Sequence, residues 1–284
     1  MQSPQLHETL QRAAQLFRWV EDPEPAPLEH PPTGRLKVGI DLGTAYLTVA
    51  VLDEKDQPLA GEYQFAHVAR DGLVVDFVGA VDLVISMKDR IEKRIGRELT
   101  HAASGYPPGV PGAEVQATSH VVEAAGLICT GLVDEPTAAN VLVQLENGVI
   151  VDVGGGTTGI AVVENGQVVY TADEATGGTH FSLVIAGAHD IPFEDAERLK
   201  VDPKQQPILF PVVKPVLEKV ASIVARHIEG FQVPEIALVG GTSAFYRAAE
   251  VIQDYTGIPT WVTDHPALVT PIGMAMHNNP KDFD

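Results

Sequence analysis

Short apolar runs, each bounded by turn residues, recur along the chain and are typical of buried β-strands. One group lies towards the N-terminus and reads LKVGIDLG, YLTVAVLD and AGEYQFAHV, at residues 36–43, 46–53 and 60–68. The other lies near the middle and reads VIVDVGGG, TGIAVVE and QVVYTAD, at residues 149–156, 158–164 and 167–173. Both follow the order strand, Asp-x-Gly, strand, turn, strand, and the Asn165-Gly166 turn of the second group is a strong hairpin signal. The chain therefore contains an internal repeat, which predicts two related lobes that present matching turns to a shared cleft.

Two longer stretches, 80–99 and 208–231, place apolar residues at the three- and four-residue spacing of helices. Pro211 and Pro215 are expected to interrupt the second helix, because proline removes a backbone hydrogen bond and clashes with the preceding turn. Strands mixed with helices of this length predict an α/β architecture in which helices cover the sheets.

The N-terminal residues form a pattern of their own. The apolar positions recur at spacings of four and three and predict a short amphipathic helix with the stripe Leu6, Leu10, Ala13, Phe17 and Val20. Residues 21–34, EDPEPAPLEHPPTG, contain too many prolines for a helix or strand and predict an extended linker. A helix this short is marginal alone, so it must pack either on the lobes of the same chain or on a partner.

Composition narrows the possible partners. The chain has 284 residues, of which 45% are hydrophobic, so it can bury a large core as one two-lobed unit or two domains. Lys and Arg number 19 against 38 Asp and Glu, and this net charge of −19 disfavours nucleic acid and anionic membranes as partners. The single cysteine, Cys129, excludes an internal disulfide and is expected to be a buried structural thiol. With no apolar run of membrane-spanning length and no signal-peptide pattern, we expect a soluble, cytoplasmic protein.

The two Asp-x-Gly turns indicate what the shared cleft could bind. Glycine turns expose consecutive N–H groups, so anionic oxygens can approach closely. Asp41 and Asp152 would repel a bare phosphate, but they suit a magnesium ion whose waters carboxylates hold while phosphates bind it directly. The alternative is a glycine-rich hairpin in which the aspartate only caps a turn. The duplication favours the magnesium–phosphate interpretation.

Five segments, in order, resemble the actin-like ATPase superfamily, and specifically the nucleotide-binding domain of Hsp70-type chaperones. They cover nearly everything after residue 36. DEPTAA together with DVGGGTT is highly specific, whereas either Gly-Gly pair alone is weak. The segments are GIDLGTAYLTVAV (39–51), VDEPTAANVL (133–142), DVGGGTTGIAVV (152–163), LVGGTSAFY (238–246) and DHPALVTPIGMAM (264–276).

The resemblance implies a two-lobed fold of duplicated ribonuclease H-like units, with mixed sheets, covering helices and a nucleotide cleft between the lobes. Lobe I would span 35–148 and lobe II 149–284, with the C-terminal helix 265–277 packing back towards lobe I. Residues 1–34 would stand apart as the amphipathic helix and linker.

The resemblance also implies ATP or ADP with Mg²⁺ as ligands, and it assigns roles to individual residues. Asp41 and Asp152 would hold the magnesium ion through waters, and Glu135, together with Asp152, would be catalytic. Glu135 would orient or deprotonate the attacking water, although it is also suited to a structural N-cap ahead of Pro136. The residues assigned to the nucleotide are Gly43, Thr44, Gly154, Gly155, Gly156, Thr157, Gly177, Gly178, Glu197, Lys200, Gly240, Gly241 and Thr242.

Some positions depart from the Hsp70 pattern. Gly159 replaces the usual final aspartate of the second phosphate motif, and Ala45 and Tyr46 replace small polar residues. Lys93 is only a weak candidate for the lysine that contacts the terminal phosphate. No β-rich peptide-binding domain follows the last motif. Hydrolysis is therefore less firmly predicted than binding.

Within the superfamily the chain is most similar to the Hsp70-like proteins of ethanolamine utilisation, through its compact size and the stretches YPPGVPG (106–112) and FEDAERLK (193–200). This implies a chaperone or assembly role towards ethanolamine ammonia-lyase or microcompartment shell proteins. The alternative is a nucleotide-binding scaffold of the pilus-assembly or division type with little hydrolysis. A sugar or acid kinase would need a substrate pocket and a catalytic carboxylate for which no motif is present, and the ten histidines form no ligand-spaced cluster.

Overall fold

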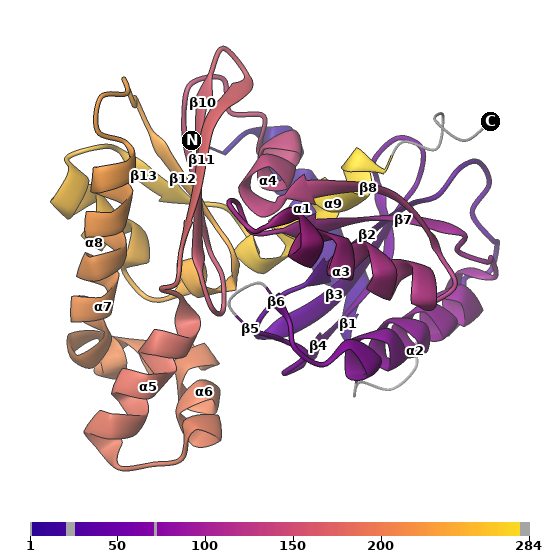
Figure 1. The fold of residues 1–284 in the computed structure, drawn as a ribbon, viewed down its shortest axis with the longest axis horizontal. Helices are drawn as coiled ribbons and strands as arrows, with labels where there is room; N and C mark the ends of the chain where they lie inside the picture. The colour runs from indigo at the N-terminus through magenta and orange to yellow at the C-terminus, as the bar shows by residue number, and fades with distance from the viewer. Residues whose placement is uncertain (1, 21–25, 71–72, 279–284) are drawn as a thin grey trace.

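Two mixed β-sheets form the framework of the computed structural model, which describes residues 2–20, 26–70 and 73–278. In Figure 1 the first sheet lies to the right and the second to the left, with helices between and outside them. The first sheet has the spatial order β1 (Phe17–Trp19), β4 (Pro58–Phe65), β3 (Tyr46–Leu52), β2 (Lys37–Leu42), β7 (His101–Tyr106) and β8 (Ile128–Asp134). The second has the order β11 (Gln167–Glu174), β10 (Thr158–Glu164), β9 (Gly148–Val153), β12 (Ile236–Val239) and β13 (Thr260–Val262).

The predicted repeat is present in the topology. Leaving β1 aside, each sheet places its strands in the order third, second, first, fourth and fifth. The first three strands are antiparallel, and the last two join parallel to the first, as β7 joins β2 and β12 joins β9. Asp41 pairs with Thr48 at the end of β2, and Asp152 pairs with Gly159 at the end of β9. The two aspartates therefore occupy matching positions, and the predicted fold class is confirmed.

Helices cover the outer face of each sheet. On lobe I, α2 (Phe77–Ile95) and α3 (Gly112–Ala124) bury apolar side chains against one face of the first sheet, where Val84 and Met87 join Ile40 in a common core. On lobe II, α7 (Gln206–His227) and α8 (Ala248–Thr256) cover the second sheet in the same way. A small helical unit, α5 (Gly178–His189) and α6 (Phe193–Val201), packs on α7 at the far end of lobe II (Figure 1).

Two shorter helices lie between the sheets. They are α4 (Glu135–Val143) and α9 (Val269–His277), and they cross in close contact. At the crossing, a Cβ on Gly273 would overlap the carbonyl oxygen of Ala138. A Cβ on Gly39 of β2 would likewise overlap the backbone of α9. Glycines at these points allow α9, which comes from the C-terminal end of the chain, to lie against the first sheet.

The prolines of α7 do not interrupt it, contrary to the sequence prediction. The helix is continuous over Gln206–His227 and includes Pro211 and Pro215. Both prolines lie on the exposed face, so the carbonyl groups that lose a helical partner can bond to water. The opposite face is buried and holds the helix together through Leu209, Val213, Leu217 and Val220.

The N-terminal helix is shorter than its apolar stripe suggested. Helix α1 ends at Leu16, and Phe17 begins strand β1, which pairs in parallel with β4. The Phe17 ring lies over Gly61 of β4, where an added Cβ would come within 2.6 Å of the ring. Val20 lies in a turn and is bonded to the Tyr63 carbonyl by its N–H at 3.2 Å. Within the predicted linker, residues 21–25 fall outside the described residues, and 26–34 have no helix or strand.

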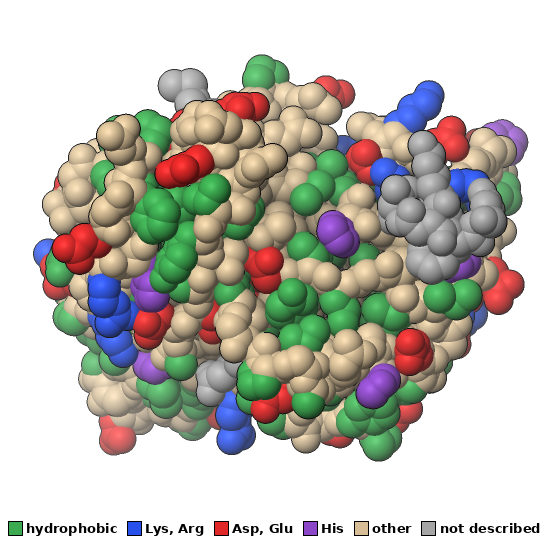
Figure 2. All heavy atoms as spheres, turned by 45° about the horizontal axis from the view of Figure 1, so that its top comes forward, with side chains coloured by type: hydrophobic (Ala, Val, Ile, Leu, Met, Phe, Trp, Pro, Cys, Tyr) green, Lys and Arg blue, Asp and Glu red, His purple; other side chains and the backbone are tan. Residues whose placement is uncertain are grey.

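The surface is mixed in character. On the face shown in Figure 2, basic side chains are scattered and form no continuous patch. The most exposed apolar side chains include Val75, Phe77 and Val78, which lie where the β5 (Ala69–Arg70) and β6 (Leu73–Val74) hairpin leads into α2. No helix within the described residues is both long and apolar enough to cross a membrane.

Candidate functional site

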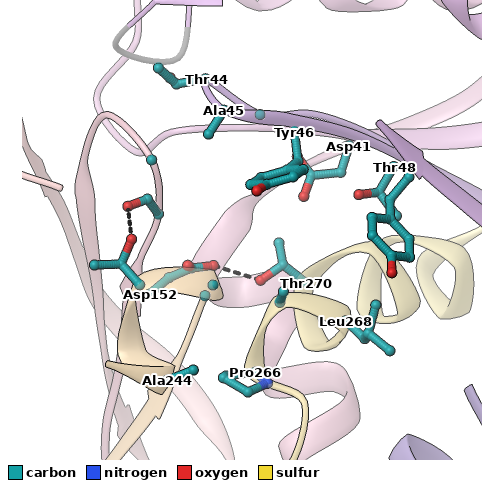
Figure 3. A pocket seen from close by; sticks show the side chains of 18 of the residues that line it. Asp41, Thr44, Ala45, Tyr46, Thr48, Asp152, Ala244, Pro266, Leu268 and Thr270 are labelled. Carbon is teal, nitrogen blue, oxygen red and sulfur yellow. Dashed lines mark hydrogen bonds between the residues drawn. The ribbon is translucent and has the colours of Figure 1, made fainter. Parts of the chain in front are cut away.

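A cavity of about 860 Å³ lies between the two lobes, at the ends of β2 and β9. Figure 3 shows Asp41 and Tyr46 of lobe I facing Asp152 and Thr270 across it. Most of the predicted site residues line the cavity: Asp41, Gly43, Thr44, Glu135, Asp152, Gly154, Gly155, Gly156, Thr157, Glu197, Lys200, Gly240, Gly241 and Thr242. Segments spread over 200 residues therefore meet in one place.

The two glycine-rich turns touch each other. A Cβ built on Gly155 would lie 2.6 Å from the Cβ of Ala45, so the second turn approaches the first as closely as only glycine permits. The second turn is held in shape by the Gly154 N–H, which donates to the Thr157 carbonyl at 3.0 Å. Ala45, which replaces a small polar residue of the Hsp70 pattern, is thus one point of contact between the lobes.

Three carboxylates, those of Asp41, Glu135 and Asp152, lie close enough in the cavity to affect one another's ionisation. Burial and, to a smaller extent, the nearby Asp152 together raise the pKa of Asp41 to about 7. Burial also raises the pKa of Asp152 to about 6, while a hydrogen bond from the Thr270 hydroxyl, at 2.6 Å from Oδ2, lowers it. Burial and then the charges of Asp41 and Asp152 raise the pKa of Glu135 well above its usual range. Such a cluster is stabilised by added positive charge.

The structure corrects the expected helix cap at Glu135. The N-cap of α4 is Asp134, whose carboxylate accepts from the Thr137 N–H at 3.0 Å. Glu135 is the first helical residue, followed by Pro136. Because Asp134 provides the cap, the Glu135 side chain is left to line the cavity.

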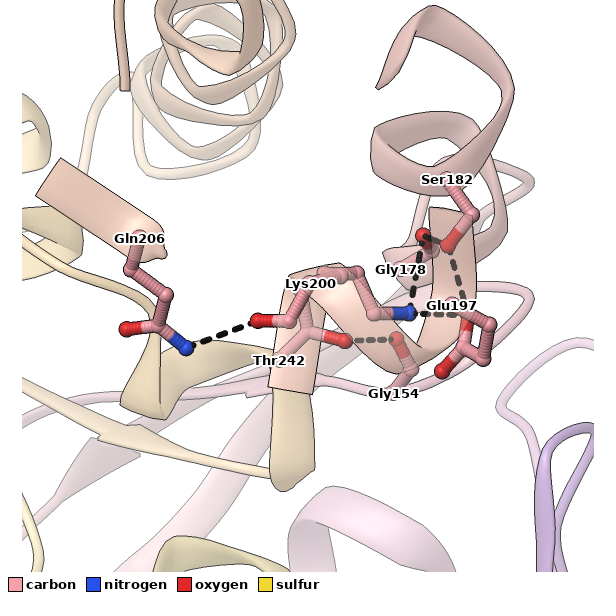
Figure 4. Close-up of polar contacts among 7 residues, drawn as sticks. All are labelled: Gly154, Gly178, Ser182, Glu197, Lys200, Gln206 and Thr242. Atoms are coloured by element: carbon pink, nitrogen blue, oxygen red, sulfur yellow. Dashed lines mark hydrogen bonds and ion pairs between the residues drawn. The ribbon is translucent and has the colours of Figure 1, made fainter. Parts of the chain in front are cut away.

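Helix α6 contributes a buried ion pair to the wall of the cavity. Lys200 Nζ lies 2.6 Å from Glu197 Oε2 and donates to the Gly178 carbonyl at 3.2 Å (Figure 4). The Ser182 hydroxyl donates to the same Glu197 oxygen at 2.5 Å, whereas the buried Glu197 Oε1 has no hydrogen-bond partner. Burial lowers the pKa of Lys200, although Glu197 opposes that effect. An unpaired buried carboxylate oxygen is costly, and a ligand hydroxyl would satisfy it.

The remaining glycines shape the wall. Gly240 has a φ of +83°, and an added Cβ would overlap Asp152 Oδ1. The neighbouring Thr242 hydroxyl donates to the Gly154 carbonyl at 2.8 Å, which ties the predicted adenosine motif to the second phosphate motif.

Gly177 and Gly178 do not line the cavity. They pack behind the second phosphate turn, where the Gly178 N–H donates to the Gly154 carbonyl at 2.9 Å. A Cβ on Gly177 would lie 2.8 Å from the same carbonyl. Gly177 and Gly178 were predicted to contact the nucleotide. In the structure they instead support the second phosphate turn from behind.

Several residues of the site were missed in the sequence. Thr270 and Ser182 orient the carboxylates of Asp152 and Glu197, but isolated hydroxyls carry no motif. Gln206 lines the cavity and bonds to the Lys200 carbonyl at 2.9 Å. The N-terminal segment also contributes residues to the wall of the cavity, including Trp19. Nothing in the sequence indicated this, because Trp19 precedes the phosphate motifs in the chain and belongs to none of them.

The departures from the Hsp70 pattern have structural reasons. Burial, Glu197 and Tyr63 together raise the pKa of Tyr46 to about 12, so its hydroxyl stays protonated beside the site. A Cβ at Gly159 would lie 3.3 Å from Pro136, which leaves little room for an aspartate. Lys93 is excluded as a phosphate ligand, because it is exposed on α2, which covers the opposite face of the sheet. Among the described residues that line the cavity, Lys200 is the only lysine or arginine.

The donor set fits a divalent cation held through water. Asp41 and Asp152 come from opposite lobes and have pKa values raised towards neutrality, so positive charge between them would relieve their repulsion. Within the described part of the chain, no three histidine, cysteine or carboxylate side chains are placed to coordinate one metal ion directly. A hydrated magnesium ion is compatible with this arrangement.

Comparison with known proteins places the chain in a family. The ethanolamine utilization protein EutJ of Escherichia coli (strain K12) is 42% identical over 258 residues, covering 90% of each chain. EutJ of Salmonella typhimurium is 44% identical over 248 residues, covering 87% of each. The chain belongs to the EutJ family. A crystal structure of EutJ from Carboxydothermus hydrogenoformans superposes with a TM-score of 0.87 at 42% identity, covering 95% of this chain and 97% of that one.

More distant similarities define the fold. The family of the type IV pilus assembly protein PilM matches residues 83–272. A PilM–PilN pilus biogenesis complex gives a TM-score of 0.72 at 13% identity, covering 87% of this chain and 99% of that one. MreB 5 of Spiroplasma citri bound to AMPPNP gives 0.71 at 17% identity, covering 88% and 98%. At these identities the likeness concerns the fold alone, which is that of actin-like ATPases.

Proposed function

We propose that the chain binds Mg-ATP in the cavity between its lobes. The observation that carries this proposal is the meeting of two equivalent strand–Asp–glycine-turn units, one from each half of the repeat, over one set of buried and half-buried carboxylates. The glycine turns offer N–H groups to phosphate oxygens, and the cavity volume lies in the range of ligand pockets, roughly 300–1,000 Å³.

The two ends of the cavity suit the two ends of a nucleotide. At the α6 end, the unpaired Glu197 Oε1 is a ready acceptor for a ribose hydroxyl, and Lys200 lies beside it. Elsewhere in the cavity, Gly155 approaches Ala45 of the first phosphate turn, and Thr157 lines the wall. Asp41 and Asp152 would hold the waters of a magnesium ion, which supplies charge neutralisation to the phosphates when bound.

Hydrolysis would depend on the ionisation of Glu135. Burial and the neighbouring carboxylates raise the pKa of Glu135 and so favour its protonated form, which cannot accept a proton. Positive charge in the cavity would lower this pKa and allow Glu135 to orient and deprotonate water. Turnover is therefore expected to be slow and strictly dependent on a divalent cation.

In the cell, we propose a cytoplasmic assembly or reactivation factor for ethanolamine utilisation, acting on the ethanolamine-degrading lyase or on its microcompartment. Support comes from relatives that cover the chain nearly end to end and are named for ethanolamine utilisation. A second candidate is a nucleotide-binding scaffold with little hydrolysis. It is supported by the PilM family match and by the high pKa of Glu135.

Thermal melts test nucleotide binding. Mg-ATP should raise the melting temperature of the wild type, because it binds only the folded state. At a ligand concentration a hundredfold above the Kd, binding adds about 3 kcal/mol to the free energy of unfolding. Asp152→Asn should lose most of this shift, while Asp254→Asn, an exposed position on α8, should retain it. An undiminished shift in Asp152→Asn would remove the magnesium assignment.

Steady-state turnover separates the two cellular roles. ATP hydrolysis is measured with and without purified ethanolamine ammonia-lyase. The chaperone role predicts turnover that the lyase stimulates. Turnover at the level of a buffer blank, with and without the lyase, would favour the scaffold.

A further inference from the structure

The N-terminal segment, residues 2–20, is anchored firmly to lobe I. Leu6, Leu10 and Ala13 of α1 are buried in a core that contains Ala50 and Leu52 of β3 and also extends into lobe II. The helix itself packs mainly on β4 of lobe I. The end of the helix is fixed by the Arg94 guanidinium of α2, which donates to the Leu16 carbonyl at 2.6 Å. Strand β1 then extends the sheet alongside β4.

The start of the same segment is attached to the other side of the cleft. Gln2 forms a reciprocal pair with Asp264: its amide donates to Oδ2 at 3.1 Å, and its carbonyl accepts from the Asp264 N–H at 2.9 Å. The His7 ring, on α1, contacts the same carboxylate oxygen. Asp264 follows β13 of lobe II and precedes the short helix η2 (Pro266–Leu268). The contacts of Gln2 and His7 are with exposed or half-exposed groups, unlike the buried anchor on lobe I.

The Asp264 segment in turn holds the nucleotide cavity. The Pro266 carbonyl accepts from the Gly240 N–H at 2.9 Å, in the predicted adenosine turn. Four residues further along, Thr270 donates to Asp152. The N-terminal segment also reaches the cavity itself, where Phe17 and Trp19 form part of its wall.

We infer that residues 2–20 form a strap that holds the nucleotide cleft closed. The strap is fixed to lobe I by buried packing and to the Asp264 segment of lobe II by the polar contacts of Gln2 and His7. In the present structure the strap is attached and the two glycine turns touch. Opening the cleft to release nucleotide separates the Asp264 segment from α1 and breaks these contacts. The inference rests on the proposed nucleotide binding and concerns the regulation of the same site.

Coupling of this kind is reciprocal. If the attached strap favours the closed cleft, bound nucleotide must favour the attached strap by the same free energy. Nucleotide should therefore protect the backbone amides of α1 from hydrogen exchange, and loss of the strap contacts should accelerate nucleotide release.

The test compares two double variants of the full-length chain. Gln2→Ala with His7→Ala removes the strap contacts, and Gln5→Ala with Glu8→Ala removes two exposed side chains from the same helix as a control. Release of radiolabelled ADP is followed after dilution into excess unlabelled Mg-ADP. We expect release roughly three- to tenfold faster from the strap variant, the scale of losing one or two partly exposed hydrogen bonds, and no change in the control.

Hydrogen exchange of α1 with and without Mg-ADP provides the second measurement. The strap predicts protection by nucleotide in the wild type and the control, and loss of this protection in the strap variant. Equal ADP release from all three proteins, with α1 exchange unaffected by nucleotide, would overturn the strap while leaving nucleotide binding intact. Failure of the wild type to retain ADP would overturn the proposed function, and the strap with it.

Discussion

Asp41 and Asp152 occupy matching positions in the repeat, but their surroundings differ. Burial raises the pKa of both, to about 7 for Asp41 and about 6 for Asp152, and the Thr270 hydroxyl lowers only the second. The carboxylates themselves could be predicted from the Asp-x-Gly repeat. The hydroxyl could not, because Thr270 lies 118 residues away from Asp152 and meets it only in the folded chain.

The raised pKa of Asp41 predicts a pH dependence of stability. Its folded pKa exceeds the unfolded value of 3.8, so between about pH 4 and pH 7 the folded state binds more protons, and its stability falls as pH rises. Asp41→Asn should remove this contribution. In urea melts, the stability of the variant relative to the wild type should increase as the pH rises from about 4 to about 7, and the difference should level off above that range. Magnesium should reduce the difference at the upper end. A constant difference at every pH would contradict the assignment.

Removing the Thr270 hydroxyl tests its role in orienting Asp152. Thr270→Val keeps the shape but leaves Oδ2 without its donor, so the variant should lose about 1–3 kcal/mol of stability. It should also bind Mg-ATP more weakly, because the pKa of Asp152 rises and less of it is ionised at neutral pH. Calorimetric titration at pH 7 and pH 8 checks this, since higher pH should restore part of the affinity. Loss of stability with wild-type affinity would limit Thr270 to a structural role.

At the scale of elements, tertiary packing determines the end of α1 and the continuity of α7, and the local sequence pattern predicted neither. The stripe from Leu6 to Val20 fits one helix, but Phe17 leaves it because β4 offers a free edge and Gly61 leaves space for the ring. Helix α7 continues through Pro211 because its buried face outweighs the lost hydrogen bonds. In contrast, the strands of the repeat and the hairpin at Asn165-Gly166, where both residues have positive φ, were predictable from local sequence.

Gly61→Ala tests how β1 is held. The added methyl group would displace the Phe17 ring, and the variant should lose about 1–3 kcal/mol of stability, the usual cost of overpacking. Trypsin should then cleave faster after Arg18, which lies in β1. Gly112→Ala, on a surface position where a Cβ meets nothing within 4 Å, is the control. Unchanged proteolysis of the Gly61 variant would show that Phe17 can move without releasing the strand.

Pro215→Ala tests the account of α7. Alanine restores an N–H that can bond to the Pro211 carbonyl on the exposed face, so the helix should become more stable by roughly 1–2 kcal/mol. Thermal melts give the measurement, with Lys219→Ala on the same helix as a neutral control. A lower melting temperature would mean that the proline shapes the helix in a way that packing requires.

At the scale of the molecule, the duplicated sheets and most of the cavity followed from motifs, because the repeat places both Asp-x-Gly turns at equivalent strand ends. The contact of Gly155 with Ala45 and the wall formed by Trp19 did not. Both depend on how the lobes and the N-terminal segment come together, which no local pattern encodes.

The net charge of −19 predicts how nucleotide reaches the cavity. Protein and Mg-ATP are both anionic, so their long-range repulsion slows association at low ionic strength. The association rate should increase between about 0.01 M and 0.15 M salt, where the Debye length shortens from roughly 30 Å to 8 Å. Stopped-flow measurements check this. A rate that falls with salt would indicate a local positive field at the cavity entrance.

The crossing of α4 and α9 sets the geometry of any movement between the lobes. Gly273 rests directly on the backbone of Ala138, with no side chain between them. Because the two backbones are in direct contact, we expect the lobes to rotate about this crossing rather than to slide past each other. Helices α5 and α6 lie at the far end of lobe II, distant from this axis (Figure 1). A small rotation about the crossing should therefore displace the outer surface of α5 and α6 much further than it displaces the glycine turns.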